Sequence, residues 1–197
     1  MAMALSLPNA ISLARLLTVP VCVWLLLDGR YATAFWVFVA AGVSDAVDGF
    51  IAKRYGKVTQ LGAVLDPLAD KALLVSVYVV MGIEGLVAAW LVILIAFRDV
   101  MILGGAVVQR LFANRLPLPP SLLSKANTTM QIVLAAALLA EHGLAIGLGP
   151  ALDVLVWVVA ATTATSFVGY LVDWVGLMMA PADDDGAGLG QPPAGPA

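Results

Sequence analysis

Charged side chains are scarce in this 197-residue sequence, where they make up 12% of the residues against 62% hydrophobic ones, with a mean hydropathy of +1.00. A soluble domain has about a quarter of its residues charged, so the composition indicates an integral membrane protein instead. Cysteine is represented by Cys22 alone, which excludes an intrachain disulfide and indicates a small buried apolar residue. The net charge of −3 arises largely from the acidic run 183–185 near the C-terminus. Because the rest of the chain is close to neutral, we expect no nucleic-acid partner.

Apolar runs long enough to cross about 30 Å of hydrocarbon recur along the chain. We predict six membrane-spanning helices, at residues 11–28, 31–54, 61–82, 86–112, 122–141 and 150–179. The first ten residues lack the basic stretch and cleavage pattern of a signal peptide, so the first helix is expected to remain in the protein. The prediction is an all-α integral membrane protein with one membrane domain over residues 1–180. Residues 181–197, rich in Pro, Gly, Ala and Asp, are expected to be a disordered tail.

Basic residues are distributed unequally between the two sides of the six predicted helices. Those on the side of the termini are Lys53, Arg54, Lys57, Arg110, Arg115 and Lys125. The opposite side has only Arg30. Loops that stay in the cytoplasm carry the excess of Lys and Arg, so we expect both termini in the cytoplasm and the protein in a bacterial-type inner membrane.

Several acidic side chains fall inside the apolar runs, where an ionisable group costs several kcal/mol unless it is paired, solvated or bound to metal. Asp45 and Asp48 are three residues apart and so share one helix face. Asp66 and Asp70 are four residues apart and share a face of the next helix. A short basic loop joins these two helices, which makes them antiparallel neighbours. The sequence therefore predicts four carboxylates at one depth, at the cytoplasmic side.

Four carboxylates in a low-dielectric setting need cations to stay ionised. Oxygen ligands without Cys or His suit Mg²⁺, Mn²⁺ or Ca²⁺ and exclude a zinc site. Metal bound by carboxylates, with phosphate as the remaining ligand, is a common arrangement for phosphoryl transfer. The alternative is a network of buried salt bridges to neighbouring basic residues, namely Lys53, Arg54, Lys71 and Arg98.

The two segments DAVDGFIAKR (45–54) and GAVLDPLAD (62–70) together resemble the signature of the CDP-alcohol phosphatidyltransferases, D-x-x-D-G-x-x-A-R followed by G-x-x-x-D-x-x-x-D. The family has six transmembrane helices and is usually homodimeric, so the resemblance implies a homodimer in the lipid bilayer. One departure is Lys53, where the family has arginine; Arg54 follows it. The bidentate fork of arginine is lost at this position, so Lys53 and Arg54 are both candidates for the donor's pyrophosphate.

The resemblance also implies a role for each matching residue. One Mg²⁺ or Mn²⁺ would be held by Asp45, Asp48 and Asp66, and a second by Asp45, Asp66 and Asp70. Asp70 would be the general base that deprotonates the acceptor alcohol. The small residues that would let CDP-diacylglycerol lie close to the backbone are Gly49, Ala52 and Gly62. The implied reaction is displacement of CMP from CDP-diacylglycerol by an alcohol.

Two further segments, FRDVMI (97–102) and LSKANTTMQ (123–131), are similar to segments of the CMP-forming cardiolipin synthases, whose acceptor is phosphatidylglycerol. The segment PNAISLAR (8–15) fits these and the phosphatidylglycerophosphate synthases, which use glycerol 3-phosphate. Arg98, Arg110 and Lys125 are candidates for holding the acceptor phosphate, which both acceptors carry. Ordinary cytoplasmic anchoring explains Arg110 as well.

The remaining polar residues have simpler expected roles. Arg98 and Asp99 are adjacent, so we expect them to point to different helix faces and not to pair, and we expect Lys71 to pair with one of the four acids. The predicted interhelical hydrogen-bonding residues are Thr162, Thr163, Thr165 and Ser166, and the small residues predicted at close helix contacts, including a dimer interface, are Gly104, Gly105 and Ala106.

Two other classes of protein were weighed against this one. A proton- or ion-coupled transporter predicts acids near the bilayer centre and a repeat between residues 1–90 and 91–179, and neither is present. A non-catalytic scaffold leaves the four acids unexplained.

Overall fold

The computed structural model describes the backbone of residues 7–55, 60–112 and 121–179, and the side chains of residues 16–44, 47, 71–105, 121–176 and 179. This part of the chain forms six helices: α1 (Leu7–Leu27), α2 (Tyr31–Tyr55), α3 (Gln60–Ile83), α4 (Ala89–Phe112), α5 (Leu122–Leu144) and α6 (Gly149–Met179). Each corresponds to one predicted helix, with ends that differ by a few residues. The helical fold class and the order of the helices are therefore confirmed.

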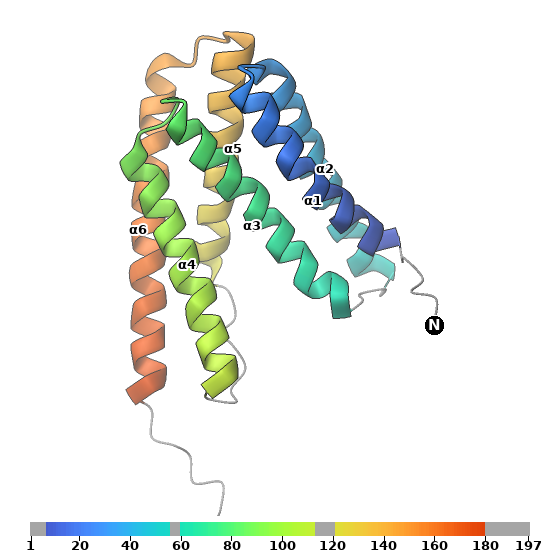
Figure 1. Cartoon of the computed structure of the whole chain (residues 1–197). Coiled ribbons are helices and arrows are strands. Elements are labelled where there is room, and N and C mark those ends of the chain that lie inside the picture. The colour runs from blue at the N-terminus through green and yellow to red at the C-terminus, as the bar shows by residue number, and fades with distance from the viewer. Residues whose placement is uncertain (1–6, 56–59, 113–120, 180–197) are drawn as a thin grey trace, which may run out of the picture.

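The helices run alternately up and down, so the α1–α2, α3–α4 and α5–α6 connections lie at one end of the molecule (Figure 1). Gly29 and Gly85 turn the first two of these connections with φ of 70° and 74°, in the left-handed region that glycine adopts at little cost. The hydroxyl of Ser121 caps the start of α5 by accepting a hydrogen bond from the Ser124 amide at 3.1 Å.

The helices pack in a chain of neighbours. α3 packs on α1, α4 and α5, while α2 packs on α1 and α5. α6 packs on α5 and α4. Within the described residues the backbones of α4 and α5 do not approach each other closely. This arrangement leaves room for a site between α4 and α5.

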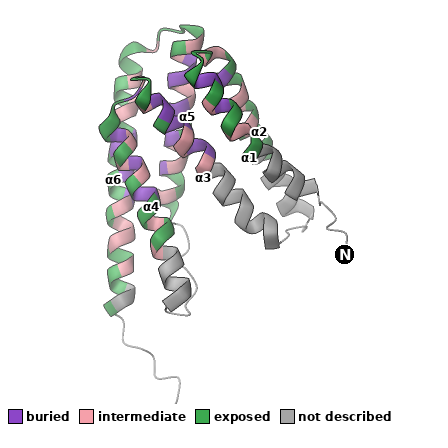
Figure 2. Ribbon diagram, in the orientation of Figure 1, coloured by how far each residue is buried: buried purple, intermediate pink, exposed green. Residues whose placement is uncertain are grey.

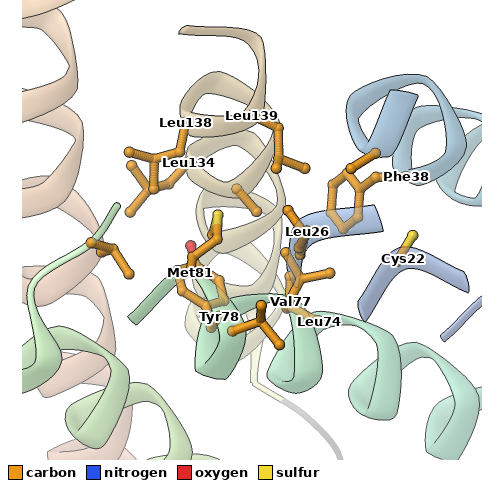
Figure 3. Close-up of a cluster of buried hydrophobic side chains, with 14 of the residues drawn as sticks. Cys22, Leu26, Phe38, Leu74, Val77, Tyr78, Met81, Leu134, Leu138 and Leu139 are labelled. Atoms are coloured by element: carbon orange, nitrogen blue, oxygen red, sulfur yellow. The ribbon is translucent and has the colours of Figure 1, made fainter. Parts of the chain in front are cut away.

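Apolar side chains from all six helices form the core, and α3 and α5 contribute most of them; part of the cluster is drawn in Figure 3. Buried positions are concentrated on α5 and on the described part of α3 (Figure 2). Cys22 is buried in this core, as predicted. Tyr78 is also buried there, and its hydroxyl donates to the Gln131 carbonyl at 2.8 Å. That bond satisfies the one polar group that the Tyr78 side chain brings into the core.

Glycine allows two close helix contacts. A Cβ on Gly143 would lie 2.6 Å from the Ala32 Cα and from the Tyr31 carbonyl carbon, so α5 rests directly on the start of α2. A Cβ on Gly105 would overlap the Tyr170 hydroxyl of α6, which confirms the close contact predicted there. Among the described residues, no atom lies within 4 Å of a Cβ built on Gly104, so no close contact is seen there. The Ala106 side chain lies outside the described residues, and the dimer interface stays a prediction.

Two helices in the described part of the chain are long and apolar enough to cross a membrane: Leu122–Leu144 and Gly149–Gly176. Shorter apolar stretches occur at Leu16–Leu27, Tyr31–Ser44 and Lys71–Ile83. Large apolar side chains such as Trp157 (68% exposed) and Trp36 (61% exposed) face outward. Outward apolar residues at this density form the kind of surface that lipid covers.

Candidate active site

The four predicted metal ligands lie on two helices that are consecutive in the sequence. Asp45 and Asp48 belong to α2, and Asp66 and Asp70 belong to the first half of α3. Their side chains lie outside the described residues, as do those of the remaining motif and anchoring residues Gly49, Ala52, Lys53, Arg54, Gly62 and Arg110. Among the side chains that are described, no group of three Asp, Glu, His or Cys residues could hold a metal ion. The metal site on α2 and α3 therefore stays a prediction.

A buried ion cluster immediately follows these acids in α3. The Asp99 carboxylate of α4 uses one oxygen to accept from the Lys71 ammonium of α3 at 2.7 Å. Its other oxygen accepts from the Arg98 Nη1 at 2.7 Å. Arg98 and Asp99 are 2% and 3% exposed, whereas the Lys71 side chain is 24% exposed. Two cations thus share one carboxylate in a site that is closed around Arg98 and open at Lys71.

The prediction that Arg98 and Asp99 do not pair is wrong. Adjacent residues on a helix do leave it in different directions. The arginine side chain is long enough, however, for its guanidinium to turn back and reach the neighbouring carboxylate. Lys71 has Asp99 as its described partner, although the sequence analysis pairs it with one of the four motif acids.

Serine hydroxyls hold the other end of the Arg98 guanidinium. The Nη2 group donates to the Ser124 hydroxyl of α5 at 2.6 Å and to the Ser166 hydroxyl of α6 at 2.7 Å. The cluster therefore connects α3, α4, α5 and α6. The Arg98 Nε is buried and has no partner among the described residues. An unpaired buried donor of this kind is uncommon in proteins.

A pocket of about 390 Å³ lies beside the cluster, between α4 and α5. Its lining residues come from α3, α4 and α5: Lys71, Arg98, Asp99, Ile102, Leu103, Ser124, Lys125, Thr128 and Thr129. These described residues include three cationic side chains and one carboxylate, which together carry a net charge of +2. Most of the surface that these residues present to the pocket is apolar, so the site is suited to an anion that also carries apolar groups.

A second polar group lies deeper between α5 and α6. The hydroxyls of Thr162 and Thr163 each donate to the Asn127 side-chain oxygen at 2.9 Å. The Gln131 amide nitrogen reaches the Thr163 hydroxyl at 3.5 Å. The predicted interhelical bonds of Thr162, Thr163 and Ser166 are therefore confirmed. That of Thr165 is wrong, since the hydrogen bonds described for its hydroxyl go to the Ala161 and Thr162 carbonyls of its own helix.

Sequence reasoning missed the part that Asp99, Ser124 and Asn127 play in these networks. A usable signal was present in the second half of the chain. Ser124, Asn127 and Gln131 recur at intervals of three and four residues on α5 and so lie on one face of it. A polar face on an otherwise apolar helix predicts a buried partner, here α6.

Comparison with known proteins decides the family. Residues 5–172 match the family model described as CDP-alcohol phosphatidyltransferase. The chain belongs to this family. The family that the acidic motif predicts is thus confirmed, and as a CDP-alcohol phosphatidyltransferase with apolar helices the chain is a membrane protein.

Curated CDP-alcohol phosphatidyltransferases similar to the chain carry the names of two reactions. It is 37% identical over 184 residues to CDP-diacylglycerol–glycerol-3-phosphate 3-phosphatidyltransferase 1, chloroplastic, of Oryza sativa subsp. japonica, covering 84% of this chain and 56% of that protein. It is 33% identical over 183 residues to cardiolipin synthase (CMP-forming) of Rattus norvegicus, and equally to that of Homo sapiens, covering 84% of this chain and 60% of each. The chain spans less than two thirds of the length of these relatives. The glycerol-3-phosphate 3-phosphatidyltransferase is slightly more similar to the chain than the two cardiolipin synthases, and these identities do not decide between the two reactions.

Proposed function

We propose that the protein transfers a phosphatidyl group from CDP-diacylglycerol to phosphatidylglycerol and releases CMP, which is the cardiolipin synthase reaction. The observation that carries the acceptor half of this proposal is the pocket between α4 and α5, with the net positive charge of its described lining residues. Membership of the CDP-alcohol phosphatidyltransferase family supports the donor half.

In this proposal the acceptor hydroxyl oxygen attacks the phosphorus of CDP-diacylglycerol that bears the diacylglycerol group. The bond from that phosphorus to the oxygen of the CMP phosphate breaks, and CMP leaves with the bonding electron pair. The hydroxyl proton passes to the carboxylate of Asp70, the general base. Lys53 or Arg54 would neutralise the pyrophosphate charge, and the small residues Gly49 and Gly62 would leave space for the nucleotide.

Asp45, Asp48, Asp66 and Asp70 would hold two divalent cations, Mg²⁺ or Mn²⁺. Four carboxylates without Cys or His form a donor set that fits these ions, and their spacing within α2 and within α3 puts each pair on one helix face. The metal would supply Lewis acidity that stabilises charge on the phosphate oxygens.

Phosphatidylglycerol and glycerol 3-phosphate both carry a phosphate that Lys71, Arg98 and Lys125 could bind. The lining of the pocket also includes Ile102 and Leu103 of α4, and Leu103 is 48% exposed. An apolar wall open to lipid suits an acceptor that carries acyl chains, so we place phosphatidylglycerol first. Glycerol 3-phosphate is the second candidate, favoured by the 37% identity to the rice relative.

We also infer six membrane crossings, both termini in the cytoplasm of a bacterial-type cell and a homodimer, with residues 1–180 as the membrane domain. The described connections 28–30, 84–88 and 145–148 support this orientation, since Arg30 is the only Lys or Arg among these residues.

The test is turnover by the purified protein in detergent or liposomes containing CDP-diacylglycerol and Mg²⁺ or Mn²⁺. Cardiolipin and CMP should form when phosphatidylglycerol is added. If product forms only with glycerol 3-phosphate, the proposed acceptor is wrong and the mechanism stands. If no CMP is released with either acceptor, the proposal is refuted. Asp66→Asn and Asp70→Asn should each lose at least about 100-fold in turnover. The matched control is Asp153→Asn, an exposed acid of α6, which should keep full activity.

A further inference from the structure

Two side chains on different helices fix the cations of the pocket described above. We infer that Asp99 and Ser166 are positioning residues, which hold the Arg98 guanidinium and the Lys71 ammonium in place for the acceptor phosphate. This inference rests on the proposed function and extends it to residues that act through another side chain.

Asp99 is placed to orient both cations because it uses both carboxylate oxygens. Each oxygen accepts one bond of 2.7 Å, from Lys71 and from Arg98, and the carboxylate is almost fully buried. Without the carboxylate, the two cations would repel each other across a short distance in a poorly solvated site. Lys71 is the more exposed of the two, so its ammonium would turn to water or to another acid, including the preceding residue of α3, Asp70.

Ser166 acts from outside the pocket. Its hydroxyl accepts from the Arg98 Nη2 at 2.7 Å, and Ser166 is not among the pocket-lining residues that the structure describes. Together with Ser124 and Asp99 it occupies both terminal nitrogens of the guanidinium. A planar group held at both terminal nitrogens has a fixed orientation.

Charge and position make opposite predictions for Asp99. Asp99→Asn removes the one carboxylate from the lining residues described, so their net charge rises from +2 to +3. If total charge alone governed binding, this variant would bind a phosphate more tightly. If Asp99 acts by positioning, the variant binds it more weakly, because Lys71 loses its partner and Arg98 is no longer held by an ionised group.

The experiment measures the Michaelis constants for donor and acceptor separately in Ser166→Ala and Asp99→Asn. We expect the acceptor constant to rise about 3- to 10-fold in Ser166→Ala, as for loss of one charge-assisted hydrogen bond, and more in Asp99→Asn. The constant for CDP-diacylglycerol should stay within about twofold, since a general structural defect would raise both. Thr165→Ala is the matched control: the neighbouring hydroxyl bonds only within α6 in the described structure, so neither constant should change.

A second readout does not depend on turnover. Inorganic phosphate, added at constant ionic strength against chloride, should raise the melting temperature of the wild-type protein and of Thr165→Ala. It should stabilise Ser166→Ala less at the same concentration. This measurement on Ser166→Ala still tests the inference if Asp99→Asn fails to fold, because Ser166→Ala removes only one buried oxygen atom and is expected to fold.

Three results would overturn the inference: unchanged constants and phosphate stabilisation in Ser166→Ala, equal rises in the donor and acceptor constants, or a lower acceptor constant in Asp99→Asn. Failure of the proposed function looks different. In that case the wild-type protein would release no CMP with either acceptor, and the phosphate arm would still report whether Ser166 positions an anion site.

Discussion

The ion cluster predicts strong energetic coupling between Arg98 and Asp99, which a double-mutant cycle can measure. Asp99→Asn leaves two cations, Arg98 and Lys71, without their shared carboxylate. Removing one partner of a buried ion pair costs about 3–5 kcal/mol, since the other charge stays buried and uncompensated. Arg98→Met leaves the Lys71–Asp99 pair intact and removes the bonds to two serines, at a cost of about 1–3 kcal/mol.

The double variant should be less damaged than these two costs added together. Once Arg98 is gone, removing Asp99 strands only Lys71, whose side chain is 24% exposed and can be hydrated. We therefore expect a coupling free energy of about 2–3 kcal/mol between the two residues, near the upper end for side chains in contact.

The assay is the free energy of unfolding in detergent micelles titrated with sodium dodecyl sulfate and followed by far-ultraviolet circular dichroism. A control cycle combines Asp99→Asn with Thr163→Val, which belongs to the other polar group and should be additive within about 0.5 kcal/mol. If the costs of Arg98→Met and Asp99→Asn are additive in the double variant, the reasoning is refuted. Additivity would mean that the contact between the two side chains contributes no coupling free energy.

Three further predictions follow from the helix contacts and the acidic motif. Gly143→Ala should lower the free energy of unfolding by about 1–3 kcal/mol because its methyl meets the α2 backbone, whereas Gly169→Ala, with nothing within 4 Å, should be neutral or stabilising in the same titration. Thr163→Val should cost about 0.6–1.7 kcal/mol by that method and leave both Michaelis constants unchanged. Chelation of divalent metal should abolish CMP release, Mg²⁺ or Mn²⁺ should restore it to the wild type but not to Asp70→Asn, and metal-independent turnover would contradict the proposed site.

Most of the fold could be predicted from the sequence because the bilayer restricts its solutions. A spanning segment must satisfy its own backbone hydrogen bonds, so a long apolar run between breakers such as Asp28-Gly29 predicts a helix with little ambiguity. The motif containing Asp45 and Asp48 predicted the family for a different reason. Together with residues 62–70, it resembles the signature of the family at every acidic position.

The cluster around Arg98 was harder to predict because its partners lie far apart in the sequence. Lys71, Ser124 and Ser166 come from three other helices, and the order in which helices pack is not encoded by the periodicity of any one of them. One local rule did apply, namely that adjacent residues of a helix do not face each other. It failed for Arg98 because the rule holds for short side chains, whereas the arginine side chain is long enough to turn back.

The ion cluster around Arg98 joins four helices, and this has a consequence for how the acceptor preference of the enzyme could change in evolution. A residue that both holds the bundle together and faces the pocket is subject to two constraints at once, so most substitutions there would be removed by selection before any change of acceptor could be tried. Lys125, Thr129 and Leu103 line the same pocket but are exposed, and their replacement leaves the buried bonds in place. A change in acceptor preference within such a bundle is therefore expected to begin at this rim, with the buried arginine kept.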